Sequence, residues 1–324
     1  MKTSNSMFFI ISFFIIIVLI LFLSYKVMPS TNSKSDNFIL TEDIIDEYFS
    51  DDINKKANSI EKIKQIVLSD LGFENWLEYK EYMEILVFPT DLQNNPDIDI
   101  IIGLNLSKDT GLIAIYKKEN SNYVLNNYIK DLSYIDYIST YEVNDKFFLA
   151  VEEIIDEKLG GYFYDERLVI YYKEESFNKV FEDSKIYESY FYEGWKKEDI
   201  KNPKWFKLTE NNIIDIIEDK DNIKIKNNKE LKLYVSEESS TSIPSNFDEY
   251  KSKKFNLDYF WDKDLNYFIQ NRGILVDSGE LIGIVSISNQ NIDYYLDNEE
   301  VTYKIIDQKG NIRYESLDKI RVLN

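Results

Sequence analysis

The stretch IDIIIGLNLSKDTGLIAIY (residues 98–116) decides the fold, because it joins two short apolar runs through a polar segment. Short apolar runs that are punctuated by Asn, Asp, Gly and Lys are typical of β-strands. The chain carries them at Ile98–Leu104, Leu112–Tyr116, Phe147–Ile155, Leu168–Tyr172, Ile223–Ile225, Leu231–Val235, Leu281–Ile287 and Val301–Ile306. The sequence therefore predicts a mainly β, antiparallel body over residues 89–324.

Turn residues and a weak internal repeat refine this body. Hairpin turns are expected at Asn227-Asn228, at Asp277-Ser278-Gly279 and at Asp307-Gln308-Lys309-Gly310, because these residues favour turns. LIAIYKKENSNYV (residues 112–124) aligns with LVIYYKEESFNKV (residues 168–180), and each copy reads as a strand, an acidic turn and a second strand. The alignment indicates blade-like units at about 89–130 and 135–182, arranged as a degenerate propeller or as stacked sheets.

The polar segment just before the first strand carries a motif. DLQNNPDIDIIIG (residues 91–103) resembles the Asp-rich loop and strand of FG-GAP/VCBS-type β-propeller blades. The resemblance implies a Ca²⁺ site, since such loops point oxygen ligands inward and Ca²⁺ takes six to eight of them. The ligands that it implies are Asp91, Gln93, Asn95 and Asp99.

Two departures from that pattern lower the expected affinity for Ca²⁺. Pro96 replaces the Gly of the sharp turn, and Gln93 and Asn95 replace charged ligands. The alternative is an ordinary polar turn, in which Asp91 or Asp99 accepts hydrogen bonds from backbone amides. The overall layout also resembles that of membrane-anchored surface proteins of low-GC Gram-positive bacteria.

Composition removes several kinds of chemistry. The 324 residues include no Cys and no His, which excludes Ser-His-Asp and Cys-His catalysis, Cys/His zinc sites and disulfides. Lys and Arg number 38 against 58 Asp and Glu, so the net charge is −20. This charge argues against nucleic acid and anionic headgroups as partners and favours a cationic partner or divalent cations.

The N-terminus is expected to anchor the chain in a lipid bilayer. Residues 7–23 contain one polar side chain, and residues 7–28 would reach about 33 Å as a helix, enough for the ~30 Å hydrocarbon core. The alternative, a cleaved secretion signal, is disfavoured because the run is long and lacks a small-residue cleavage site. We therefore expect a transmembrane anchor (1–28), a cytoplasmic N-terminus, a spacer (29–40) and an extracytoplasmic body.

Between spacer and body the apolar residues follow a helical period. Ile44, Ile45 and Tyr48 form one stripe, and a second stripe runs from Ile60 to Leu71. Trp76–Leu86 carries aromatic residues at near-helical spacing. The sequence therefore predicts a helical neck over residues 41–88.

Four acids supply weak candidates for catalysis. Glycoside hydrolysis needs two carboxyl groups about 5–5.5 Å or 6.5–9.5 Å apart. Glu152, Glu153, Asp156 and Glu157 flank an apparent hairpin turn at Leu159-Gly160-Gly161. Acids at such a position are more typical of a solvated turn than of a catalytic pair.

The four tryptophans, Trp76, Trp195, Trp205 and Trp261, could stack on sugars, although core packing is the more usual role. Three functions stay open at this point. The first is a non-enzymatic, membrane-anchored extracytoplasmic module that binds a protein, a cell-wall polymer or a cation. The second is an exported carboxylate-based carbohydrate hydrolase, and the third is a structural subunit of a membrane complex.

Overall fold

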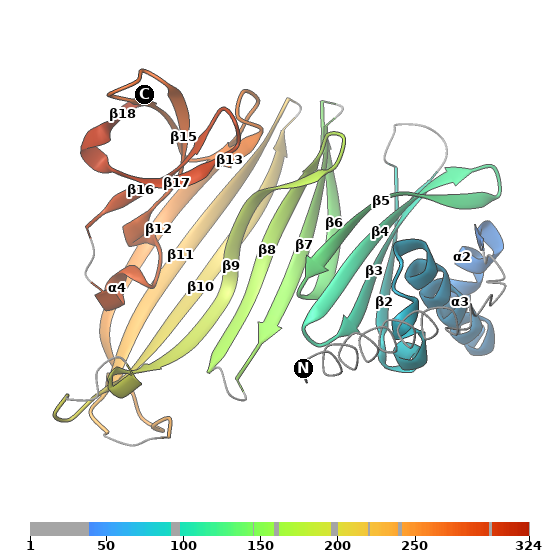
Figure 1. Cartoon of the computed structure of the whole chain (residues 1–324), viewed down its shortest axis with the longest axis horizontal. Coiled ribbons are helices and arrows are strands. Elements are labelled where there is room, and N and C mark those ends of the chain that lie inside the picture. The colour runs from blue at the N-terminus through green and yellow to red at the C-terminus, as the bar shows by residue number, and fades with distance from the viewer. Residues whose placement is uncertain are drawn as a thin grey trace, which may run out of the picture. The chain divides into compact units, whose positions relative to one another are not determined.

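The computed structural model describes residues 39–91, 98–144, 146–158, 162–195, 200–219, 221–238, 242–297 and 300–323. Residues 39–324 form one unit built from three antiparallel sheets, which confirms the mainly β prediction (Figure 1). The predicted anchor (7–28) and all but the end of the spacer lie outside the described residues. Within the described part, none of the helices combines the length and the apolar character that crossing a membrane requires.

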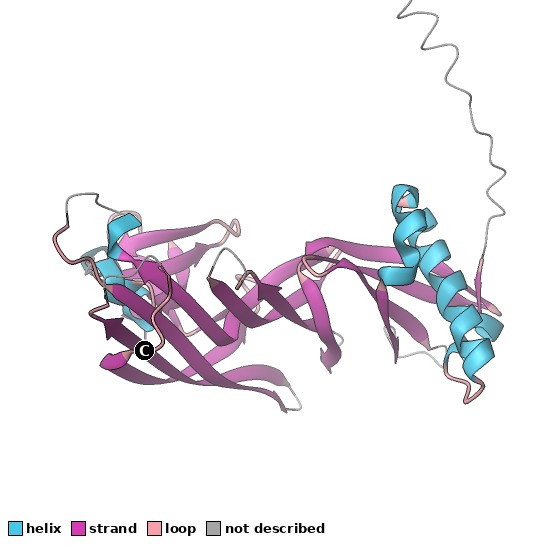
Figure 2. Cartoon of the chain, turned by 90° about the horizontal axis from the view of Figure 1, so that it is seen from below, coloured by secondary structure: helices cyan, strands magenta, loops and turns pink. Residues whose placement is uncertain are grey.

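The first sheet has the strand order β1-β5-β4-β3-β2. Three helical segments cover one of its faces and share a core with it, which places the predicted neck against the body (Figure 2). The strands are β1 (Leu40–Thr41), β2 (Glu84–Thr90), β3 (Asp99–Ser107), β4 (Thr110–Glu119) and β5 (Asn122–Leu132). The helical segments are α2 (Glu42–Tyr48), α3 (Ile53–Leu71) and the 3₁₀ helix η1 (Glu74–Tyr82).

The ends of these helices follow from local residues. The Asp52 carboxylate accepts hydrogen bonds from the backbone N–H groups of Asn54 and Lys55, so it caps α3. Gly72 ends this helix in the left-handed region at φ 76°. The third predicted helix was partly wrong: it is a 3₁₀ helix that ends at Tyr82, and Glu84–Leu86 already belong to β2.

The decisive stretch reads as continuous apolar runs because both faces of its strands are buried. In β3, Ile100 and Ile102 face the helices, whereas Ile101 packs against strands of the second sheet. In β4, Ile113 packs on the same side as Ile101. The first two sheets therefore pack face to face, as in the stacked arrangement that the sequence left open.

The second sheet has eight strands in the order β13-β12-β11-β10-β9-β8-β7-β6. The sheet curls strongly, because aromatic side chains from strands far apart in this order share one core. The ring centroids of Phe148 on β7 and Trp261 on β12 lie 4.9 Å apart. The strands are β6 (Tyr134–Val143), β7 (Lys146–Asp156), β8 (Phe163–Lys173), β9 (Phe177–Tyr192), β10 (Trp205–Asp219), β11 (Asn222–Ser236), β12 (Asp248–Asp262) and β13 (Tyr267–Ile269). A 3₁₀ turn, η2 (Glu193–Trp195), follows β9.

Of the two predicted blade-like units, the first matches a run of paired strands and the second does not form a separate unit. The first unit (89–130) coincides with the antiparallel run β2–β5, and both copies of the internal repeat form hairpins, β4–β5 and β8–β9. The second unit (135–182) does not form a sheet of its own, because β9 pairs with β10 and the sheet continues to β13.

One predicted turn was wrong. Asn227 and Asn228 lie in the middle of the fifteen-residue strand β11 and pair with both neighbouring strands. Asn favours turns by its local chemistry, but partners supplied by another strand keep Asn227 extended here. Its Nδ2 donates a 2.7 Å hydrogen bond to Asp183 of β9.

The third sheet has the order β17-β16-β15-β14-β18, and its two edge strands are joined only by the 3₁₀ turn η4 (Leu317–Lys319). The sheet has a small isoleucine-rich core of its own. Both remaining predicted turns are confirmed, with Gly279 and Gly310 in the left-handed region. The elements are β14 (Asn271–Leu275), β15 (Leu281–Ile287), η3 (Ser288–Gln290), α4 (Tyr294–Asp297), β16 (Thr302–Asp307), β17 (Ile312–Ser316) and β18 (Ile320–Leu323).

Candidate functional site

The structure describes the two ends of the implied Ca²⁺ loop, Asp91 and Asp99, whereas Gln93 and Asn95 lie outside the described residues. The Asp99 side chain is buried in β3, and its Oδ1 accepts a 2.9 Å hydrogen bond from the backbone N–H of Lys118. Burial raises the pKa of Asp99, and this hydrogen bond opposes the rise. Asp99 therefore has the backbone-binding role that the polar-turn alternative assigned to it.

The structure does not bring the four candidate acids together. Glu152 and Glu153 are adjacent on β7 and so point to opposite faces of the sheet. Glu152 pairs with Lys185 at 2.6 Å, and Glu153 is buried against Arg167 at 3.0 Å. Asp156 lies on the same face as Glu152 but four residues along the strand, a distance of about 13 Å.

Asp156 and Glu157 do not form a facing pair of carboxyl groups either. Asp156 and Glu157 are both exposed near the end of β7, and the Asp156 carboxylate accepts a 3.1 Å hydrogen bond from the backbone N–H of Lys158. The turn at 159–161 lies outside the described residues. Glu152 and Glu153 lie on opposite faces and are each paired with a basic residue, and Asp156 is about 13 Å from Glu152. These four acids therefore do not form the facing carboxyl pair that a glycosidase needs.

The four tryptophans divide into two groups. Trp205 and Trp261 are buried, which confirms the core interpretation for them. Trp195 is exposed by 55 %, and its ring stacks on Tyr162 with centroids 5.8 Å apart. Trp76 is half-buried on η1, where it borders a surface hollow.

Trp76, Tyr79 and Tyr82 form what we call the aromatic ladder. They are three residues apart on η1, and a 3₁₀ helix has three residues per turn, so the three side chains leave the same side of the helix. The rise of about 2.0 Å per residue spaces successive rungs by roughly 6 Å. The measured distance between the Trp76 and Tyr79 ring centroids is 6.1 Å.

The ladder is exposed rather than packed away. The Tyr79 side chain is exposed by 50 % and Tyr82 by 74 %. Runs of 3₁₀ helix beyond three or four residues are uncommon, and η1 extends over nine. An α-helical turn would rotate these side chains away from one another, so the 3₁₀ geometry is what places them on one side of η1, where the Trp76 and Tyr79 rings meet edge to face at 69°.

The ladder borders a hollow of about 420 Å³, within the size range of small-molecule sites. Polar groups from three strands and a turn complete it. The hollow is lined by Trp76, Tyr79, Tyr82, Glu84, Asn105, Leu106, Ser107, Lys108 and Tyr134.

Two of these residues are held by hydrogen bonds. The buried Asn105 side chain exchanges two hydrogen bonds with the backbone of Ile135, which joins β3 to β6. The Tyr134 hydroxyl donates to Glu84 Oε2 at 2.5 Å. This hydrogen bond, with burial and the negative charges of Glu84 and Asp136, raises the pKa of Tyr134 to about 12. Tyr134 therefore keeps its proton, and with it this hydrogen bond to Glu84, across the neutral range.

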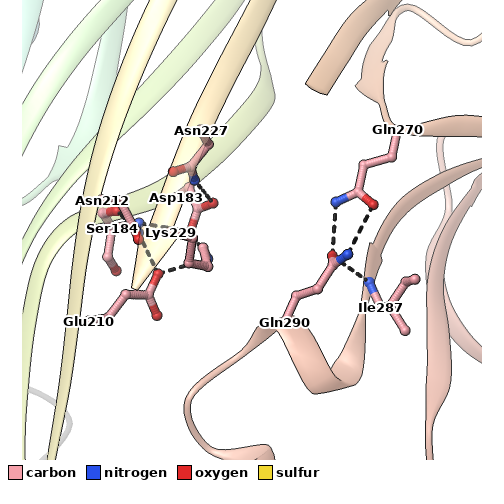
Figure 3. Close-up of polar contacts among 9 residues, drawn as sticks. All are labelled: Asp183, Ser184, Glu210, Asn212, Asn227, Lys229, Gln270, Ile287 and Gln290. Carbon is pink, nitrogen blue, oxygen red and sulfur yellow. Dashed lines mark hydrogen bonds and ion pairs between the residues drawn. The ribbon is translucent and has the colours of Figure 1, made fainter. Parts of the chain in front are cut away.

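A second polar cluster, the buried charge band, lies inside the curled sheet and was not predicted (Figure 3). Lys229 of β11 pairs with Asp183 and with Glu210, both at 2.7 Å. Burial raises the pKa of Glu210, Lys229 opposes this rise and Asp183 reinforces it. Along the same face of β11, Ile225 belongs to one apolar core and Leu231 to another, so the band separates the two.

The surroundings of the band favour a structural role. A hollow of about 80 Å³ borders Asp183 and Lys229, which is room for a few water molecules but below the size of ordinary ligand sites. Across this hollow, Gln270 and Gln290 exchange amide hydrogen bonds of 2.9 and 3.3 Å (Figure 3). Gln270 is the single residue between β13 and β14, so this pair fixes the link between the second and third sheets.

Sequence reasoning noted the aromatic spacing around Trp76 but missed the ladder. The signal was the strict three-residue spacing of Trp76, Tyr79 and Tyr82. Tyr134, Ser107 and Lys108 come from distant strands and carry no such signal. The chain matches no protein-family model, and a search of curated proteins gives no significant match.

Proposed function

We propose that the chain is a membrane-anchored extracytoplasmic protein that binds a partner outside the membrane without catalysing a reaction. The observation that carries the binding role is the aromatic ladder, where half-exposed rings line a hollow of ligand size. Exposed Tyr and Trp residues supply large contact areas at low entropic cost, which is typical of binding surfaces.

The anchor and the location rest on the sequence. Residues 7–28, which contain the apolar run 7–23, are long enough to cross a bilayer as a helix. The cytoplasmic N-terminus and the exported body belong to the same proposal and rest on the sequence alone. The likeness of residues 91–103 to a propeller-blade loop remains part of this proposal. The extracytoplasmic location is supported by the likeness of the overall layout to membrane-anchored surface proteins of low-GC Gram-positive bacteria.

The experiment locates the full chain and then asks what it binds. In cells that express it, the proposal expects the chain in the membrane fraction and its body digested when protease is added to intact cells. The full chain, purified in detergent, should then sediment with isolated cell walls. A chain that is released into the medium, or a body protected from protease, would contradict the location.

A binding failure is separate from a location failure. If the chain is exported and anchored but sediments with no wall preparation, the structural-subunit alternative replaces the binding role. Co-purification of the full chain with membrane partners, compared with a form lacking residues 1–28, then identifies whether the anchor holds such a complex.

A further inference from the structure

We infer that the aromatic ladder is a binding site for a neutral glycan chain, with successive sugar rings stacking along Trp76, Tyr79 and Tyr82. The inference rests on the proposed function, because it names the ligand class of the same surface. It starts from the periodicity of the ladder, continues with the polar groups of the hollow and ends with the charge around it.

The first argument is geometric. The Trp76 and Tyr79 ring centroids lie 6.1 Å apart and their planes are inclined by 69°, which suits a ligand that presents an apolar face at each step of similar length and turns successive faces relative to one another. A chain of six-membered sugar rings does so, because each ring has a face of C–H groups and repeats at about the length of one ring. A proline-rich peptide, the other ligand that docks on aromatic grooves, repeats only every ~9 Å in the polyproline II conformation.

The second argument is the chemistry around the rings. Sugar rings carry hydroxyl groups at their edges, which need hydrogen-bond partners beside the stacking surface. Glu84, Ser107 and Lys108 line the hollow together with the rings and supply polar side chains of this kind. Few polar groups on a mainly apolar surface are what orients a small polar ligand.

The third argument is charge. Nucleobases also stack on aromatic rings, but their phosphates would meet a negative surface here. η1 carries Glu74, Glu78 and Glu81, and Glu84 follows it. The one lysine of η1, Lys80, is paired with Glu61 at 3.3 Å, so its charge is compensated. The ladder therefore disfavours nucleic acids and anionic polymers, and a neutral glycan fits.

The test is a calorimetric titration of the full chain in a detergent without a sugar headgroup. The probes are N-acetylglucosamine oligomers and glucose oligomers of one to six units. Affinity for at least one series should rise up to three rings and then level off, because the ladder has three rungs. Tyr82→Ala and Tyr79→Ala should each weaken binding about tenfold, and Tyr82→Phe should preserve it.

Tyr250→Ala is the matched control, since Tyr250 is a similarly exposed tyrosine, at 70 %, on β12 of the second sheet. It should bind as the unmodified chain does. Near-ultraviolet circular dichroism of each variant confirms that a loss of binding is not a loss of fold.

Three outcomes would overturn the inference. One is that neither oligomer series binds, and another is that Tyr82→Ala binds as tightly as Tyr250→Ala. The third is that a proline-rich peptide binds and loses affinity in Tyr82→Ala. If the ladder variants still sediment with cell walls, the proposed function is retained and only the assignment of the aromatic ladder as the binding site is rejected.

Discussion

Trp261 and Tyr82 lie in two aromatic-rich regions of opposite exposure, the core inside the curled sheet and the ladder on η1. Trp261 is exposed by 5 % and contacts the rings of Phe148, Tyr172 and Phe268. Tyr82 is exposed by 74 %. In the strand, alternate residues face inward, whereas in the 3₁₀ helix every third residue shares one side. Aromatic rings that other strands cover thus build a core, whereas Tyr79 and Tyr82 on η1 stay at the surface.

The two regions should differ most in their contribution to the free energy of unfolding, and the largest loss is expected from the aromatic core inside the second sheet. Trp261→Ala should lower the free energy of unfolding by about 3–5 kcal/mol, since it leaves a cavity among packed rings. Urea unfolding followed by near-ultraviolet circular dichroism measures this. Tyr250→Ala, on the same strand but exposed, should change it by less than about 0.5 kcal/mol. Equal losses in the two variants would break the distinction between core and surface.

The buried charge band borders the aromatic core and gives the next effect. Lys229→Met leaves Asp183 and Glu210 without their cation and should cost about 3 kcal/mol. Water in the neighbouring hollow can hydrate the Asp183 carboxylate, which places the cost at the lower end of the usual range. Lys224→Met is the control, because Lys224 is exposed on the same strand. A loss no larger than that of the control would show that the band is dispensable.

Glu210 should make stability depend on pH. Burial raises its pKa in the folded protein, so its contribution to stability is fully present below its ordinary pKa and is lost as pH rises through the folded value. Glu210→Gln should therefore gain less stability on acidification from neutral pH than the unmodified chain does. Unfolding free energies at several pH values test this. Other buried acids, such as Asp99 and Asp165, act in the same direction and are common to both proteins, so only the difference between them reports on Glu210.

The smallest effect on stability belongs to the ladder. Tyr82→Ala should change the free energy of unfolding by less than about 0.5 kcal/mol, because most of the ring is already in contact with water. A loss above 2 kcal/mol, measured by the same urea unfolding, is the result that would identify Tyr82 as a packing residue and remove it from the binding surface.

The sequence alone predicted correctly those strands whose two faces are both buried. Ile100, Ile101 and Ile102 form an unbroken apolar run because helices cover one side and β6–β8 the other. The sequence-based prediction was wrong where a residue's partner lies far away in the chain. Asn227 was expected in a turn, but its hydrogen-bond partner Asp183, 44 residues away, holds it in a strand. The overlooked signal of a continuous strand was that Ile223, Ile225, Leu231 and Leu233 keep the same two-residue period on both sides of Asn227-Asn228.

The candidate site was recognisable only in part. The aromatic residues around Trp76 were noted, but a period of 3.0 cannot be separated from 3.6 over so short a segment. Tyr134 reaches the hollow from a strand fifty residues beyond Glu84, and only the fold brings them together. The four acids near Glu152 are close in sequence, which was more typical of a solvated turn than of a catalytic pair. The structure places Glu152 and Glu153 within β7, on opposite faces of the strand.

The central claim is that the register of the ladder, and not its composition, creates the binding surface. Exchanging two neighbours, Glu81→Tyr with Tyr82→Glu, keeps the composition but moves the last ring off the shared side of η1. The measurement is the affinity of this double variant for the best-binding sugar oligomer by calorimetry. We predict a loss of about tenfold, as large as that of Tyr82→Ala. Affinity equal to that of the unmodified chain would contradict the claim.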